Sequence, residues 1–111
     1  MLIFNRRALT LASMVRHPFA DASIGLPDCE GGVMAQTGTM TAPRTVALCL
    51  AAVGNAVIFL DESGTISEAN TLTLVAASGD TINGAQTLVL NAPYASAILI
   101  SDGVSKWTRL Q

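Results

Sequence analysis

The sequence of 111 residues predicts an all-β fold, and three observations carry this prediction. From residue 44 onward, apolar and polar residues alternate with the period of two that is typical of half-buried strands. Turn-forming residues, mainly Gly, Asn and Asp, separate alternating segments that begin about 8–15 residues apart. β-Branched residues recur within these segments. We therefore expect a compact antiparallel sandwich, jelly-roll-like or fibre-type β-module with an irregular N-terminal arm.

The first expected strands follow one another from residue 44. Residues 44–50 place Val46, Leu48 and Leu50 on one face, and residues 56–61 (AVIFLD) end at an ESGT turn. The next two strands are predicted from shorter alternating segments, TLTLV at residues 71–75 and TLVL at residues 87–90.

The remaining elements are a pair of bends and a C-terminal hairpin. Between the two preceding strands, GDTINGAQT predicts two tight bends with one buried aliphatic residue, Ile82. The strand at residues 97–101 runs into Asp102–Gly103, a strong hairpin signal. The last strand lies in residues 106–110, where Trp107 and Arg109 share one face.

The N-terminal part of the chain differs, because residues 1–43 keep no period for long and contain three of the four prolines. Residues 2–15 (LIFNRRALTLASMV) fit either a strand pair or a short amphipathic helix. We divide the chain into an N-terminal arm and irregular connector, residues 1–43, and a β-domain, residues 44–111. The alternative, a first strand and loop of the same domain, fits residues 1–43 equally well.

Targeting and membrane segments are not expected. The Arg6–Arg7 pair with its following apolar stretch resembles an export signal, but Arg16 and His17 end that stretch without a small-residue cleavage site. No window approaches the roughly 20 apolar residues that cross a membrane. We expect an unprocessed, soluble protein that binds no membrane.

Composition indicates an assembly component. Charged residues make up 13% of the chain and apolar residues 50%, against a charged fraction of about 25% in an average soluble protein. So few charges favour burial against other copies or against a neighbouring protein. The net charge is −2 and the basic residues are scattered, which argues against nucleic-acid binding.

We predict no catalytic, cofactor-binding or metal-binding residues. Most carboxylates lie at expected turns, where Asp binds its own backbone, and a zinc site needs four ligands whereas the chain has one histidine. His17 lies in an expected loop, and the sequence contains no nucleophile elbow, G-x-S-x-G, that a catalytic histidine would activate. The carboxylates considered are Asp21, Asp28, Glu30, Asp61, Glu62, Glu68, Asp80 and Asp102.

Four further residues have an expected structural role. We expect Cys29 and Cys49 to be reduced, because Cys49 lies in the apolar run VALCLAAV. Trp107 and Tyr94 offer rings that stack on a sugar, but a tryptophan near the end of a strand is more often a core or interface anchor.

Residues 43–111 resemble a small β-module that recurs in virion proteins of tailed bacteriophages. The resemblance lies in an order of motifs, namely a TV-L strand, DESGTIS, NTLTL, GDTINGA, an aliphatic pair of strands and SDG before SKW. Residues 1–42 match nothing in that module. Its members occur in capsid decoration proteins, head fibres and tail-fibre segments, usually as homo-oligomers.

The resemblance implies a non-enzymatic structural protein of the virion. The expected function is a capsid decoration, or cement, protein made in the host cytoplasm, with the major capsid protein and further copies of itself, as trimer or dimer, for partners. The alternative is a tail-fibre or head-fibre tip that binds a receptor or carbohydrate; a small glycan hydrolase is the weakest hypothesis. The expected strands hold more aliphatic residues than one small core needs: Leu72, Leu74, Ile82, Leu88, Leu90, Ile98 and Ile100.

Overall fold

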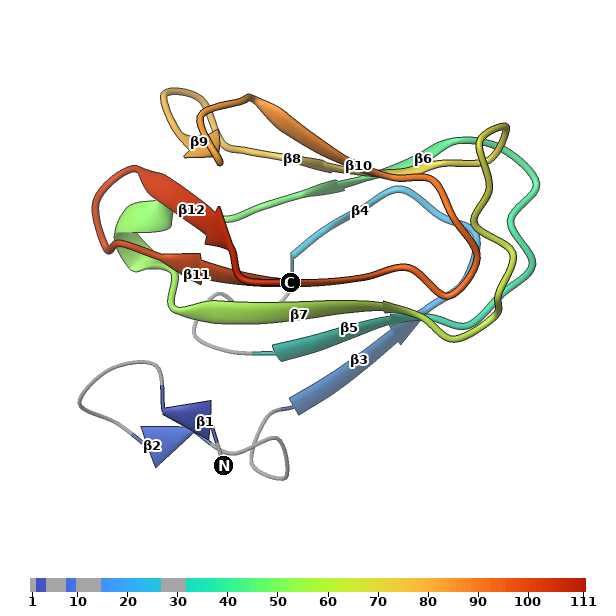
Figure 1. Ribbon diagram of the computed structural model, residues 1–111, viewed down its shortest axis with the longest axis horizontal. Coiled ribbons are helices and arrows are strands. Elements are labelled where there is room, and N and C mark those ends of the chain that lie inside the picture. The colour runs from blue at the N-terminus through green and yellow to red at the C-terminus, as the bar shows by residue number, and fades with distance from the viewer. Residues whose placement is uncertain (1, 4–7, 10–14, 27–31) are drawn as a thin grey trace.

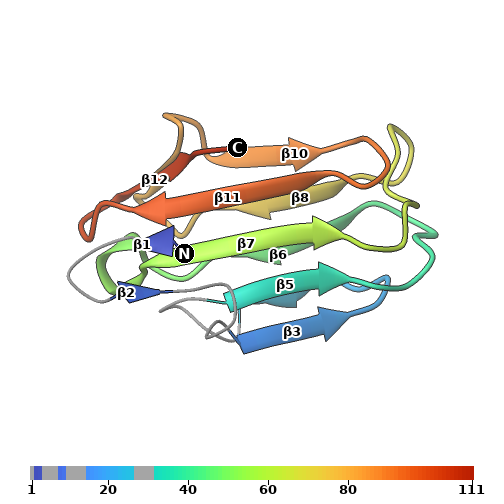
Figure 2. The same cartoon turned by 60° about the horizontal axis from the view of Figure 1, so that its bottom comes forward.

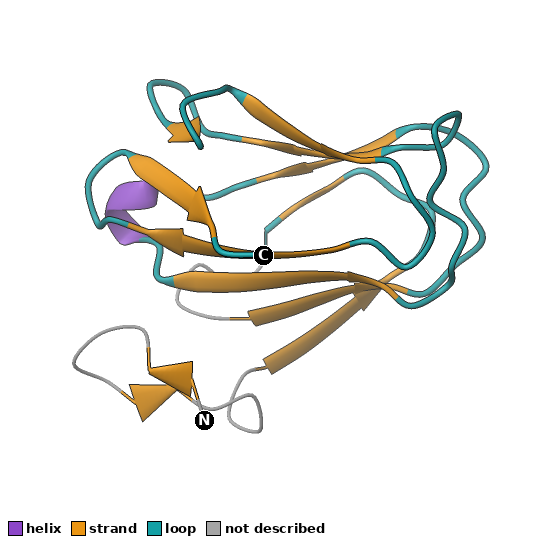
Figure 3. Cartoon of the chain, in the orientation of Figure 1, coloured by secondary structure: helices purple, strands orange, loops and turns teal. Residues whose placement is uncertain are grey.

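Two stacked β-sheets make up most of the structure, a computed structural model that describes residues 2–3, 8–9, 15–26 and 32–111 (Figures 1 and 3). The prediction of an all-β fold is confirmed. The six-stranded sheet has the order β3-β5-β7-β11-β12-β9, and the four-stranded sheet has the order β10-β8-β6-β4. The strands are β1 (Leu2–Ile3), β2 (Ala8–Leu9), β3 (Val15–Phe19), β4 (Ile24–Gly25), β5 (Gly32–Gln36), β6 (Arg44–Ala47), β7 (Ala56–Asp61), β8 (Leu72–Val75), β9 (Thr81–Ile82), β10 (Thr87–Leu90), β11 (Ser96–Ser101) and β12 (Lys106–Arg109), with a 3-10 turn, η2 (Ala51–Val53).

The chain alternates between the two sheets, since each strand from β4 to β11 lies in the sheet opposite to the strand before it. In the first part of each sheet, neighbouring strands are therefore two elements apart and run parallel, namely β3–β5–β7 and β4–β6–β8. The intervening strand in the other sheet supplies the crossover that parallel strands require. The expectation of an antiparallel sandwich is thus corrected to two mixed sheets, with antiparallel pairing at β7–β11, β11–β12 and β8–β10.

The hydrophobic core lies between the sheets. Inward-facing residues of β7 and β11 pair as Val57 with Leu99 and Phe59 with Ala97, and all four are fully buried. Trp107 of β12 joins them, and its ring lies against Gly54, where a Cβ would come within 2.5 Å of the Trp107 Cη2 atom. Packing of this density ties both sheets into one unit.

The predicted turns of the C-terminal half are confirmed. Asp102 Oδ1 accepts hydrogen bonds from the backbone N–H groups of Val104, Ser105 and Lys106, and Gly103 has a φ of 79°. The connection between β11 and β12 spans residues 102–105, longer than the two-residue turn that the DG pair suggested. Ile82 is buried as expected.

The N-terminal segments that the structure describes belong to the same sheets as the rest. β5 pairs with β7 along its whole length, and β4 pairs with β6. The division at residues 43 and 44 therefore cuts through both sheets, and the interpretation as strand and loop of one domain describes residues 15–26 and 32–36. β1 and β2 form an antiparallel strand pair, as one of the two interpretations of residues 2–15 has it. Within the described ranges, no helix is both long and apolar enough for a membrane crossing.

Candidate functional site

An aliphatic surface covers the side of the six-stranded sheet that faces away from the core. The register aligns Val33, Ile58 and Ile98 in one row across β5, β7 and β11, and Arg16 of β3 stands at the end of that row. Residues that alternate with the core residues of the same strands extend this row. We define the outer face by its seven members: Val33, Ala35, Ala56, Ile58, Leu60, Ile98 and Ile100.

The outer face is covered only in part. Ala35 and Ala56 are fully buried and Ile58 is 5% exposed, although their side chains point away from the core between the sheets. Ile98 and Ile100 remain half-buried. The β1–β2 hairpin lies on this side of the sheet, near the start of β7 (Figures 1 and 2). The β1–β2 hairpin thus forms a small third layer against the outer face.

The aliphatic residues that the sequence analysis considered a surplus divide between the core and the outer face. Leu72, Leu74, Ile82 and Leu90 are buried in the core, and Leu88 packs against it. Ile98 and Ile100 instead belong to the outer face. An unbroken apolar run such as AVIFL in β7 is typical of a strand that is buried on both faces.

A buried carboxylate organises the loops at the opposite end of the sandwich from η2. Asp61 ends β7, and its Oδ1 accepts hydrogen bonds from the Ser63 hydroxyl (2.6 Å) and from backbone N–H groups of residues 63 and 64. Its Oδ2 accepts from the N–H groups of Ile66 and Tyr94, both at 3.1 Å. Burial raises the pKa of Asp61, but the bonds from Ser63, Ile66 and Tyr94 outweigh it and hold that pKa below its ordinary value.

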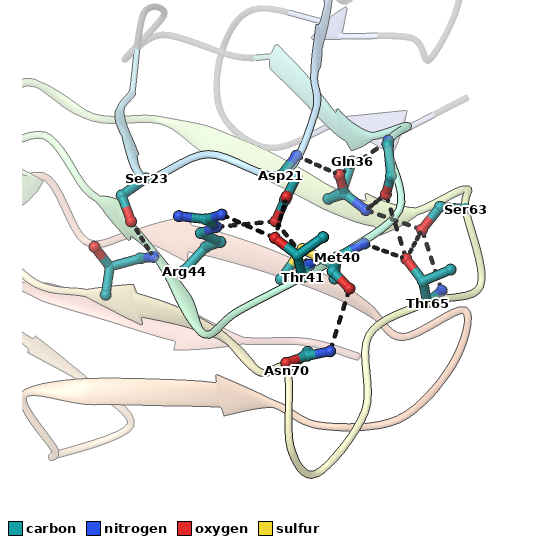
Figure 4. A network of polar contacts seen from close by, with 11 residues as sticks. Asp21, Ser23, Gln36, Met40, Thr41, Arg44, Ser63, Thr65 and Asn70 are labelled. Carbon is teal, nitrogen blue, oxygen red and sulfur yellow. Dashed lines mark hydrogen bonds and ion pairs between the residues drawn. The ribbon is translucent and has the colours of Figure 1, made fainter.

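Gln36 extends this network through the interior (Figure 4). Its side chain is fully buried; Nε2 donates to the Gly38 carbonyl and to the Ser63 hydroxyl, and Oε1 accepts from the N–H groups of Asp21 and Gly38. The Thr65 hydroxyl in turn accepts from the Met40 N–H. Every polar group of Gln36 has a partner, which is the condition for a stabilising buried amide.

A second carboxylate fastens the start of β6 to the loop after β3 (Figure 4). Asp21 accepts from Arg44 Nε at 2.9 Å and from the Thr41 hydroxyl at 2.6 Å. The hydrogen bonds from Arg44 and Thr41 hold the pKa of Asp21 well below its usual range. These contacts give the loop end of the molecule a fixed shape.

The other carboxylates also have local structural contacts or lie exposed. Asp80 accepts the N–H of Ala51 at 2.8 Å and so caps η2, while Glu62 forms an ion pair with Arg16 of β3. Glu68 is exposed. Asp28 and Glu30 lie outside the described residues. Among the residues that the structure describes, no three of the His, Cys, Asp and Glu side chains gather as metal ligands.

The two cysteines and the histidine are placed as follows. Cys49 is disulfide-bonded, which corrects the expectation of a reduced thiol. The reason is that Cys49 points to the opposite side of its segment from Val46 and Leu48, so it is half-buried and not a core residue. Cys29 lies outside the described residues. His17 is half-buried in β3 in register with Met34, and so stands in a strand where the sequence suggested a loop.

The two candidate sugar-stacking rings differ sharply in exposure. Trp107 is 1% exposed and belongs to the core, so it offers no surface to a glycan. Tyr94 is 71% exposed, has a φ of 59°, and lies over Gly64, where a Cβ would come within 2.4 Å of the Tyr94 Cζ atom. Of this pair, Tyr94 is the ring that a ligand can reach.

No protein-family model matches the chain, and no curated protein sequence matches it.

Proposed function

We propose that the chain is a structural virion protein of a tailed bacteriophage, a capsid decoration protein that binds the outer surface of the major capsid shell. The order of motifs in residues 43–111 suggests this function, and the outer face supports it. Seven aliphatic residues form a surface that is separate from the core, and the charged Arg16 lies at its β3 edge. A surface of this kind suits contact with another protein.

The outer face and the β1–β2 hairpin together form the proposed contact region. Burial of apolar surface stabilises an interface by roughly 25 cal/mol per Å². When a protein bridges two shell subunits, separating the subunits exposes this apolar surface again. The bridge therefore stabilises the shell against the pressure of the packaged DNA. Because binding follows mass action, the shell becomes more stable as its sites fill. The partners are the major capsid protein and further copies of the chain.

Cosedimentation with capsids tests the proposal. Heads of the phage that encodes the chain, assembled without this protein, are mixed with the purified chain and centrifuged. We expect the full chain to pellet with the heads and a variant lacking residues 1–14 to stay in the supernatant while its far-ultraviolet circular dichroism remains that of a β protein. Binding by the truncated chain would refute the role of the N-terminal hairpin.

A matched pair of substitutions tests the outer face itself. Ile98→Lys places a charge in the aliphatic row, while Val75→Lys places the same charge at a half-buried, β-branched position of β8 in the other sheet. We expect the first to abolish pelleting and the second to preserve it. Failure of the unmodified chain to bind heads at all would contradict a decoration function.

The second candidate function is a tail-fibre or head-fibre tip that binds a host receptor or carbohydrate, and the exposure of Tyr94 favours it. Binding to a glycan array that is lost in Tyr94→Ala would support this function over decoration. Trp107→Ala is unsuitable for this test because it removes a core side chain. Copy number separates the two: hundreds of copies on the shell indicate decoration, and a few at the tail indicate a fibre.

A further inference from the structure

A groove lies at one edge of the sandwich, between β10 and the end of β12. Its volume is about 380 Å³, and its lining includes Val89 and Asn91 on one side and Ser96, Arg109 and Gln111 on the other. Both segments lie at the same edge of the molecule (Figure 2). We call this the edge groove.

The edge groove exists because β9 is too short to close it. β9 pairs with β12 only at residues 81–82, and the Asn83 side chain then accepts the N–H of Arg109. Beyond that point no described strand pairs with the side of β12 that faces away from β11. The six-stranded sheet therefore ends early on this side, opposite the free edge of the four-stranded sheet.

The backbone of β10 offers unpaired groups to this groove. The Gln86 carbonyl accepts the N–H of Ala76, which sets the hydrogen-bonding phase of the antiparallel β8–β10 pair. Because hydrogen-bonded pairs alternate, Leu88 and Leu90 bond to β8, whereas the N–H and C=O groups of Thr87 and Val89 point outward. Such an edge is a template for an added strand.

Arg109 supplies a positive charge without a carboxylate partner among the described residues. Its Nη2 donates to the Ser96 carbonyl at 2.8 Å, while its Nε is buried without a hydrogen-bond partner. A buried donor without a partner costs free energy, and a carboxylate satisfies a guanidinium better than any neutral acceptor does. The guanidinium thus places a positive charge on the wall of the groove without a carboxylate partner among the described residues, which favours an anionic ligand.

We propose that the edge groove binds an extended peptide segment that carries a carboxylate. The peptide backbone pairs with Val89 and so adds a strand to β10, and the carboxylate, from an acidic side chain or a free C-terminus, binds Arg109. Strand addition provides the affinity and the arginine selects the charge. This site is separate from the outer face, and the proposal does not depend on capsid binding.

Fluorescence anisotropy with a labelled peptide tests the charge selection. The probe is a six-residue peptide of alternating Thr and Val with a Glu at its last position; its counterparts replace Glu by Gln, or the terminal carboxylate by an amide, so that side-chain and terminal carboxylates are distinguished. We expect a carboxylate-bearing peptide to bind at least about tenfold more tightly than the fully neutral one. Equal affinities would overturn the proposal.

A matched pair of variants locates the effect. Arg109→Gln and Lys106→Gln remove the same charge from the same strand, but Lys106 is exposed and does not line the groove. We expect the first to abolish the preference for carboxylate and the second to retain it. The same preference in both variants would overturn the assignment to Arg109.

Two measurements on the unmodified chain avoid any dependence on the folding of a variant. Saturation with the acidic peptide should shift the Arg109 Nε–H resonance and should slow amide exchange at Val89, with the already paired Leu88 as the internal control. If neither signal changes while the peptide is bound, the peptide binds elsewhere and the proposal is wrong.

Discussion

The two faces of the six-stranded sheet are both apolar, but they are closed in different ways. On β11, Leu99 points into the core and is fully buried, whereas its neighbour Ile98 belongs to the outer face and is half-buried. The inner face is closed by a whole second sheet, and the outer face is covered in part by a hairpin of two short strands. The comparison teaches that the inner face is buried completely by the second sheet, whereas the outer face keeps half-buried aliphatic residues such as Ile98 and Ile100.

The largest difference between the two faces is expected when the inward-facing side chain of Leu99 is shortened. Leu99→Ala removes a fully buried side chain from the centre of the core, and we expect it to lower the free energy of unfolding by about 2–5 kcal/mol. Urea denaturation followed by tryptophan fluorescence measures this change, because Trp107 lies in the same core. A loss of much less than this would place the stabilising core elsewhere.

The next largest effect is expected in the loops that hold the two sheets together. Asp61→Ala leaves five donors without their acceptor, two of them in Ser63 and one each in Gly64, Ile66 and Tyr94. We expect a loss of about 1–3 kcal/mol, since water reaches some of these groups. Thermal unfolding measures it, and unchanged stability would show that the loops hold without the carboxylate.

Acid should lower the free energy of unfolding through Asp61 and not through the outer face. The pKa of Asp61 is lower in the folded chain than its ordinary value of 3.8, so its contribution is present above that value and is lost as the pH falls through the lower folded pKa. None of the seven aliphatic residues of the outer face is titratable. We therefore expect the free energy of unfolding to fall below about pH 4 and Asp61→Asn to flatten that decline; an equal decline in both proteins would contradict this.

The smallest effect on stability is expected on the outer face. Ile98→Ala removes a side chain isomeric with that of Leu99, but from a half-buried position, so the cost should be about 1 kcal/mol or less. Sedimentation equilibrium should nonetheless show weaker self-association than in Leu99→Ala. If Ile98→Ala were the more destabilising of the two, the assignment of core and contact faces would be reversed.

The sequence predicted the positions of the strands better than it predicted which strands pair with one another. Residues 87–90 match β10 because alternation reports burial along a single strand, and residues 56–61 match β7 because an apolar run of strand length ends at a turn. The parallel pairing was missed, since a periodic pattern does not identify which strand lies alongside. β3 and β5 were missed as well: Pro18 breaks the pattern in β3, although a proline is tolerated there because β3 is an edge strand.

The candidate surfaces were predicted in part. Of the expected surplus of aliphatic residues, only Ile98 and Ile100 lie on the outer face, while the other five belong to the core or pack against it. The unbroken run AVIFL is the signal that identifies β7 as a strand buried on both sides. The edge groove left no trace in the sequence, because it depends on where β9 ends relative to β12. The sequence favoured a core or interface role for Trp107, and Trp107 is a core residue; the exposure of Tyr94 emerges only from the fold.

The alternation of the chain between the two sheets governs the order in which the molecule is completed on the ribosome. Each early strand waits for a partner two elements later, and the free side of β7 receives β11 only after residue 96 has been made. We expect amides of β5 and β7 to gain protection from exchange together with those of β11 during refolding; earlier protection of β5 and β7 would contradict this. A nascent chain that stops short of its last hairpin therefore lacks the strand that pairs with the free edge of β7, in the middle of the larger sheet.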